Sequence, residues 1–205
     1  MEKTRKQHWE TIYETKKFEE VSWYQAVPEV SLTILSEFGV EKDWAIIDIG
    51  GGDSYFVDFL LNQNYTDISV LDISEKALQR VQNRLESKAE KVHWIASDIT
   101  EFKPSKKYDF WHDRAVFHFL TEPNDVKKYA EIAADSISEK GIMVIGTFSK
   151  NGPLKCSGIE IKQYDEKEMS AVFETDFELV NFRKIIHITP MQSGQHFIFC
   201  VFRKK

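Results

Sequence analysis

The stretch that decides the fold is AIIDIGGGDSYFVDFLL, residues 45–61. It begins with an uninterrupted apolar run rich in β-branched residues, which is typical of a strand covered on both faces. It then turns on three consecutive glycines and continues with apolar residues at helical spacing. Glycines at a strand-to-helix junction allow tight curvature and close approach of a ligand to the backbone. The stretch therefore predicts a βα unit whose loop holds a ligand.

The alternation of strand and helix patterns continues along the chain. Between helical patterns, further buried strands are expected at residues 68–73, 92–98, 108–113 and 141–148. Two last strand patterns, at 177–188 and 195–204, are separated by too few residues for a crossover helix, so they should pair antiparallel. The prediction is an α/β protein, a three-layer sandwich with a mostly parallel sheet and a reversed last strand.

The residues before the first strand carry helical patterns. We therefore expect a helical cap over residues 1–40 and one core over residues 41–205. Within the cap, Trp23, Tyr24 and Gln25 belong to a Ser-Trp-Tyr-Gln run that precedes a proline. These side chains either close over a ligand or dock the cap on the sheet, and we favour a place in the site.

Composition narrows the function classes. The net charge of −6 disfavours a grip on nucleic-acid phosphates. No apolar run approaches the roughly 18–20 residues of a membrane span, and the charged N-terminus lacks the apolar segment of a secretion signal. The two cysteines, Cys156 and Cys200, form no metal-binding pair. We expect a cytoplasmic protein without a metal site or membrane contact, acting as a monomer or homodimer.

Three acidic residues follow three successive strands. Asp48 stands two residues before the first glycine, where its carboxylate would repel a pyrophosphate and favour a cation. Asp72 ends the second strand and can take both hydroxyls of a ribose, a role that fits NAD equally well. Asp98 follows the third strand and can accept from the exocyclic amine of a base. Tyr55 occupies the last glycine position of a dinucleotide-binding loop, so a dinucleotide is disfavoured.

The motifs DIGGGDS (48–54), VLDIS (70–74) and SDI (97–99) resemble those of the class I S-adenosylmethionine-dependent methyltransferases. The resemblance covers residues 40–205 and includes the terminal hairpin, which in that family belongs to a seven-stranded sheet of order 3-2-1-4-5-7-6. Ser54 replaces the last glycine of the family's loop. The resemblance implies S-adenosylmethionine as cofactor and S-adenosylhomocysteine as product.

The resemblance also implies which residues hold the cofactor. The methionine part would contact Asp48, Gly50, Gly51, Gly52, Ser54 and the segment around His112. The ribose would contact Asp72, with Ile73 beside the adenine. The adenine amine would meet Asp98, with Ile99 adjacent.

The implied reaction is in-line displacement by a nucleophile on a small molecule or a protein side chain. Positioning and desolvation can supply most of the acceleration, so a base matters only if the acceptor must lose a proton. The candidate bases are His112, Asp113 and His118, and the other substrate-side candidates are Arg114 and His187. The strings SWYQ, HDRAVFHFL and KCSG are similar to those of a bacterial group of methyltransferases. SWYQ is also similar, more loosely, to a string in lysine methyltransferases that act on translation factors.

Two other function classes stay open at this point. One is a regulatory protein that binds S-adenosylmethionine without catalysis. The other is an NAD-dependent oxidoreductase, against which Tyr55 and the terminal hairpin argue.

Overall fold

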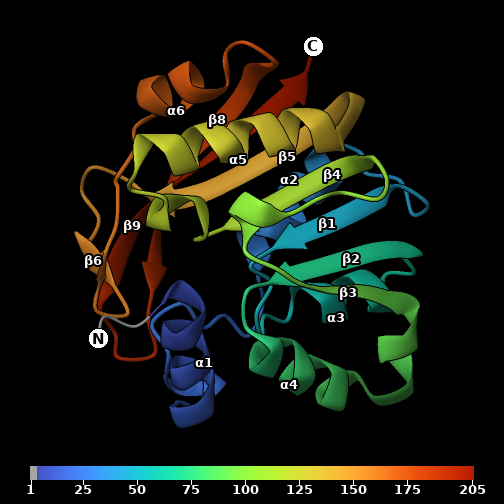
Figure 1. Cartoon of the computed structure of the whole chain (residues 1–205), viewed down its shortest axis with the longest axis vertical. Helices are drawn as coiled ribbons and strands as arrows, with labels where there is room; N and C mark the ends of the chain where they lie inside the picture. The colour runs from blue at the N-terminus through green and yellow to red at the C-terminus, as the bar shows by residue number, and fades with distance from the viewer. Residues whose placement is uncertain (1–3) are drawn as a thin grey trace.

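A seven-stranded sheet lies between two layers of helices in the computed structural model, which describes residues 4–205 (Figure 1). The strand order is β3-β2-β1-β4-β5-β9-β8. All neighbouring strands are parallel except β9, which is antiparallel to both β5 and β8. The predicted fold class and strand order are thereby confirmed. The strands of the sheet are β1 (Ala45–Ile49), β2 (Asp67–Asp72), β3 (Val92–Ala96), β4 (Tyr108–Arg114), β5 (Ile137–Phe148), β8 (Phe177–Ile188) and β9 (Gly194–Lys204).

The α-helices are α1 (Arg5–Thr15), α2 (Glu29–Glu37), α3 (Phe56–Asn62), α4 (Glu75–Leu85), α5 (Pro123–Ser136) and α6 (Glu166–Phe173). Short 3-10 turns are η1 (Phe18–Glu20), η2 (Glu86–Lys91), η3 (Ile99–Glu101) and η4 (Phe117–Phe119). Ser74 caps α4 by accepting from the backbone N–H of Ala77, which satisfies one of the free donors of the first turn. Asp165 and Glu168 form a reciprocal capping box on α6.

The two faces of the sheet bury separate cores. One core joins the sheet to α2, α3 and α4, and the other joins it to η3, α5 and α6. Because successive side chains of a strand point to opposite faces, Ile46 lies in the first core and Ile47 in the second. The same parity separates neighbouring residues of β4, which decides the roles of His112 and Asp113 below.

Several boundaries differ from the sequence expectation. Strand β5 begins at Ile137 rather than residue 141, because Ile137 pairs with Tyr108 before a shift in register. Strand β3 ends at Ala96, since the side chain of Asp98 already caps η3. The loop after β5 contains a small hairpin, β6 (Lys155–Cys156) and β7 (Ile159–Glu160), which the sequence pattern did not predict. Among the residues described, no helix has the length and apolarity needed to cross a membrane.

Helix α1 lies at the edge where the arrows of β1 and β2 end (Figure 1). It packs against α4 and is tied to it by ion pairs from Lys6 to Glu75 at 2.6 Å and from Lys76 to Glu14 at 2.8 Å. Ligands of open α/β sheets bind outside the carboxyl ends of the strands. The helix therefore covers the mouth of the predicted site.

Candidate functional site

The glycine loop curves so tightly that side chains have no room in it. Gly50 has φ +65° and Gly52 has φ +49°, the left-handed region that glycine adopts without strain. A Cβ atom at Gly50 would lie 1.9 Å from Cγ2 of Val116, and one at Gly52 would lie 2.4 Å from the hydroxyl oxygen of Tyr13. The loop is thus packed between the segment after β4 and helix α1.

Two adjoining cavities follow this loop along the carboxyl ends of β1 to β4. The first opens to solvent and spans about 740 Å³. Its lining includes the predicted residues Gly50, Asp72, Ile73, Asp98, Ile99, Trp23 and Arg114. The lining of the second cavity includes the predicted residues Asp48, Gly50, Gly51, Ser54, Gln25, Trp23, His112 and Arg114. Tyr13, Trp23, Gly50 and Arg114 line both cavities and mark the junction between them.

Asp72 lies in the first cavity at the end of β2. Its side chain is buried, and Oδ1 accepts from the backbone N–H of Ser74 at 2.8 Å. Burial raises the pKa of Asp72 to about 7, although backbone N–H groups of Ser74 and Gly52 oppose the rise. A carboxylate in this position can accept hydrogen bonds from the hydroxyl groups of a ligand.

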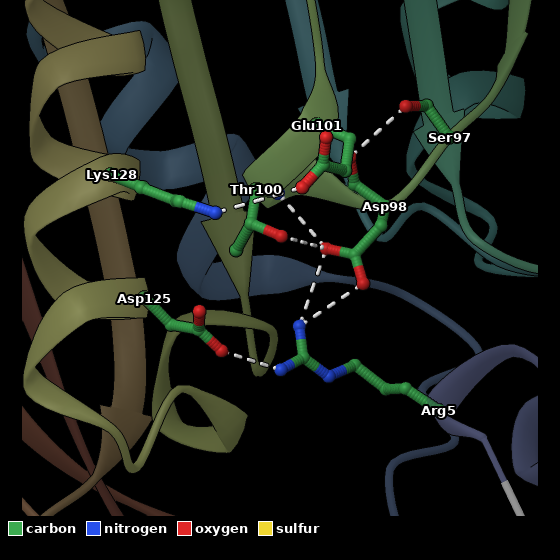
Figure 2. Close-up of polar contacts among 7 residues, drawn as sticks. All are labelled: Arg5, Ser97, Asp98, Thr100, Glu101, Asp125 and Lys128. Atoms are coloured by element: carbon green, nitrogen blue, oxygen red, sulfur yellow. Dashed lines mark hydrogen bonds and ion pairs between the residues drawn. The ribbon is translucent and has the colours of Figure 1, made fainter.

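Asp98 meets two separate parts of the chain in the first cavity. Its Oδ1 accepts from the N–H and the hydroxyl of Thr100, both at 2.9 Å. Figure 2 shows Arg5 reaching from α1 between Asp98 and Asp125, with distances of 3.1 Å to Asp98 Oδ2 and 2.7 Å to Asp125 Oδ2. The guanidinium thereby fastens α1 across the cavity.

Asp48 is held by His112, one of the predicted bases. The two residues are register partners in β1 and β4, and Nδ1 of His112 donates to Oδ1 of Asp48 at 2.7 Å. The other ring nitrogen lies 2.8 Å from the hydroxyl oxygen of Ser31, and the ring packs against Phe56 at 4.4 Å between centroids. Both nitrogens of His112 are occupied, so the ring positions Asp48 and is not free to take a substrate proton.

The other two candidate bases lie away from both cavities. Asp113 faces the opposite core, where Oδ2 accepts from the hydroxyl of Tyr129 at 2.7 Å and Oδ1 from backbone N–H groups. The ring of His118 is buried against Phe148, and burial, with the nearby Arg114, lowers its pKa to about 3. Because side chains alternate along β4, Asp113 points to the sheet face opposite that of His112 and away from both cavities. Burial, which lowers its pKa, makes His118 a poor base. Their placement argues against a catalytic role for either residue.

The Ser-Trp-Tyr-Gln run both docks the cap and faces the site. Its backbone is held by Nε2 of His187, which donates to the Ser22 carbonyl at 2.8 Å, and by Nη1 of Arg114, which donates to the Trp23 carbonyl at 2.9 Å. The side chains of Trp23 and Gln25 line the cavities. Tyr24 instead packs against aromatic rings at the cap surface, and His187 contributes to neither lining.

Several lining residues are not among those predicted from the sequence. Arg5, Trp9 and Tyr13 line the first cavity from α1. Their spacing of four residues puts them on one helical face, a signal that was present in the sequence. Asp53 lines the second cavity, where Oδ2 pairs with Arg80 at 3.0 Å. Its Oδ1 is buried and has no hydrogen-bond partner within residues 4–205.

The donor set of the two cavities fits S-adenosylmethionine. At the second cavity, the orphaned oxygen of Asp53 and the carboxylate of Asp48 can take the ammonium of the methionine part. At the first cavity, Asp72 can take ribose hydroxyls and Asp98 has carboxylate oxygens beside an apolar wall. Gly52 lies outside both linings, beneath the Tyr13 hydroxyl.

Comparison with known proteins agrees with this arrangement. Residues 46–141 match the family model of a methyltransferase domain. A malonyl-[acyl-carrier protein] O-methyltransferase from Ilyobacter polytropus is 28% identical over 112 residues. The match covers 54% of this chain and 42% of that relative, so the chain corresponds to less than half of the relative's length.

Solved structures share the fold. An S-adenosylmethionine-dependent methyltransferase from Anabaena variabilis superposes with a TM-score of 0.76 at 14% identity, covering 100% of this chain and 96% of its own. The 1,6-didemethyltoxoflavin-N1-methyltransferase of Burkholderia thailandensis, with bound S-adenosylhomocysteine, gives a TM-score of 0.70 at 17% identity, covering 87% and 77%. Residues 46–141 match the model of the methyltransferase domain family, and the chain has the fold of the class I S-adenosylmethionine-dependent methyltransferases.

Proposed function

We propose that this chain is an S-adenosylmethionine-dependent methyltransferase that moves a methyl group by in-line displacement to a nucleophile on its acceptor. The observation that carries the proposal is the row of acids along one sheet edge: Asp48 in one cavity, and Asp72 and Asp98 in the cavity beside it. Carboxylates at these points suit a cationic nucleoside and disfavour a polyphosphate.

The proposed contacts divide between the two cavities. The first would hold the nucleoside, with Asp72 on the ribose hydroxyls and Asp98 toward the adenine amine. The apolar side chains Ile73 and Ile99 would lie beside the base. The second would hold the methionine part. Its proposed residues are Asp48, Gly50, Gly51 and Ser54, with Asp53 added by the geometry. Gly52, which lies outside this lining, would shape the loop and not contact the cofactor directly.

The chain's own residues would act by positioning and by excluding water. The cofactor supplies an electrophilic methyl group on a sulfonium, so the protein need not generate a strong electrophile. His112 fixes the carboxylate of Asp48. Trp9, Tyr13 and Trp23 line the first cavity with aromatic rings. These rings would exclude water from a bound cofactor, which would strengthen electrostatic contacts inside. The placement of Asp113 and His118 leaves no role for them as bases in this proposal.

The acceptor is proposed to be a small molecule or a protein side chain. The relative from Ilyobacter polytropus is a malonyl-[acyl-carrier protein] O-methyltransferase, which supports an acceptor that is small or is carried by a protein. The net charge of −6 disfavours nucleic acid. We further propose that the cap and core work as one domain in the cytoplasm, as a monomer or homodimer.

Calorimetry tests the proposal. S-adenosylhomocysteine should bind at micromolar levels or tighter and NADH should not. Asp72→Ala should weaken the binding of S-adenosylhomocysteine at least tenfold. Asp67→Ala, which removes a half-buried carboxylate paired with Lys106 at the other end of the same strand, should leave it unchanged. Tight NADH binding without a signal for S-adenosylhomocysteine would overturn the assignment.

Catalysis needs a second measurement. Labelled S-adenosylmethionine incubated with the protein and with metabolite or proteome extracts should yield a labelled product. Binding of S-adenosylhomocysteine without label transfer from any extract would favour the regulatory alternative.

A further inference from the structure

Arg114 is a half-buried cation whose hydrogen bonding is incomplete. It ends β4 and lines both cavities at their junction. Nη1 donates to the Trp23 carbonyl at 2.9 Å, whereas Nε and Nη2 are buried and have no partner within the described chain. Burial lowers the pKa of Arg114 to about 10, so the guanidinium is still charged at neutral pH. Leaving a buried charge without partners is costly, which points to an anionic ligand.

The surroundings of Arg114 supply no paired anion: the Asp48 carboxylate acts on it only through space and is hydrogen-bonded to His112. The Arg114 guanidinium lies 5.3 Å from the ring centroid of Phe197. Burial lowers the pKa of both His118 and His187 and raises that of the Cys156 thiol to about 11, so these neighbours are neutral at pH 7. Over residues 4–205, no carboxylate pairs with the Arg114 guanidinium.

The free atoms are arranged for a particular anion. Nε and Nη2 lie on one edge of the planar guanidinium, and a carboxylate can accept from both at once. We propose that Arg114 binds a carboxylate at the junction of the two cavities through Nε and Nη2. This inference rests on the proposed function, because the carboxylate would belong either to the methionine part of the cofactor or to an acceptor that is an organic acid.

Charge at the junction supports an anion there. The sulfonium joins the nucleoside to the methionine part, so a cofactor spread over both cavities brings a second positive charge near Arg114. Two cations at close range repel one another strongly in a partly buried site. A carboxylate between them removes that repulsion, whichever molecule carries it.

The first arm of the test examines the cofactor's carboxylate. Calorimetry compares S-adenosylhomocysteine with 5′-methylthioadenosine, which keeps the nucleoside and lacks the amino-acid carboxylate. If Arg114 binds the methionine carboxylate, Arg114→Gln should weaken S-adenosylhomocysteine by about 10- to 100-fold and leave 5′-methylthioadenosine unchanged. Arg114→Lys, which keeps the charge without the fork, should fall between, and thermal unfolding of each variant checks its fold.

The second arm uses the unmodified protein loaded with S-adenosylhomocysteine. Sodium acetate, a minimal carboxylate, is titrated at constant ionic strength while the ¹⁵N signal of the Arg114 Nε–H is followed, assigned by its loss in Arg114→Lys. If the site serves an organic-acid acceptor, acetate should shift this signal saturably and acetamide should not. Arg84, whose Nε already donates to Asp58 at 3.2 Å, provides an internal control signal that should stay fixed.

The outcomes separate the two proposals. A response in the first arm assigns the carboxylate to the cofactor, and a response in the second arm assigns it to the acceptor. Normal binding of S-adenosylhomocysteine with no response in either arm overturns the inference and leaves the proposed function intact. Failure of the unmodified protein to bind S-adenosylhomocysteine overturns the proposed function, and the inference with it.

Discussion

Substituting Gly52 by alanine tests whether α1 is docked on the glycine loop. The added Cβ would lie 2.4 Å from the Tyr13 hydroxyl oxygen and 3.3 Å from its Cζ. Overpacking of this kind costs about 1–3 kcal/mol. The left-handed backbone of Gly52, with φ +49°, adds about 1 kcal/mol for any L-residue. We therefore expect Gly52→Ala to lower the free energy of unfolding by about 2–4 kcal/mol.

A matched control separates the two contributions. Gly39 also has a left-handed backbone, with φ +63°, but a Cβ there meets nothing within 4 Å. Gly39→Ala should therefore cost only the backbone strain of about 1 kcal/mol. Tyr13→Phe removes the hydroxyl that the new Cβ of Gly52→Ala would strike. The double variant should lose about 1–2 kcal/mol less than the sum of the single variants.

Urea denaturation followed by circular dichroism measures all five proteins, the four variants and the unmodified chain. Docking of α1 on the loop requires a coupling energy between positions 13 and 52. If the losses of Tyr13→Phe and Gly52→Ala add to within about 0.5 kcal/mol, helix α1 does not rest on the loop. An equal loss for Gly39→Ala and Gly52→Ala would refute the steric part of the argument.

Three further predictions follow from the site. The affinity for S-adenosylhomocysteine should rise up to about tenfold per pH unit as pH increases toward 7 and level off above it, because burial raises the pKa of Asp72 to about 7 and ribose hydroxyls favour the ionised form. Calorimetry on Asp72→Asn should show no such slope. A flat pH profile for the unmodified protein would contradict the assignment of Asp72 to the ribose. Asp113→Asn should lower the free energy of unfolding by about 1–3 kcal/mol, because the Tyr129 hydroxyl loses its acceptor. The affinity for S-adenosylhomocysteine, measured by calorimetry, should stay unchanged. Weaker binding would show that Asp113 has a role in the site. Arg5→Ala should speed dissociation of S-adenosylhomocysteine about fivefold in stopped-flow fluorescence, since it releases about 1 kcal/mol of ion pairing across the cavity. Lys6→Ala removes an ion pair of α1 to α4 and none across the cavity, so it should leave the rate unchanged.

The strands of the fold, the glycine loop and the acids of the site can be predicted from local sequence. Continuous apolar runs identify buried strands, since both faces of a parallel sheet are covered. The glycine loop and the acids Asp48, Asp72 and Asp98 belong to the ends of such strands or directly follow them. Their meeting at one edge is therefore a consequence of parallel pairing. The class of ligand can be inferred at this level because it depends on charge type and position along the chain.

The tertiary structure decided what each side chain near that edge can do. His112 and Asp113 are adjacent in sequence, yet strand parity gives one to Asp48 and the other to Tyr129 in the opposite core. Which face holds the ligand depends on where the helices pack, and a strand pattern without helix contacts does not contain that information.

The cap depends still more on distant contacts. The spacing of Arg5 and Tyr13 predicts that they share one face of a helix. The residues that this face contacts, Asp98 and Gly52, lie far along the chain. The unpaired edge of Arg114 is likewise a property of packing, because a partner for a guanidinium can come from any segment. The strands, the loop and the charges that favour a cationic nucleoside can thus be predicted from local sequence. Which side chains have atoms available to contact that ligand depends on tertiary packing, because a hydrogen-bond partner can come from any neighbouring segment.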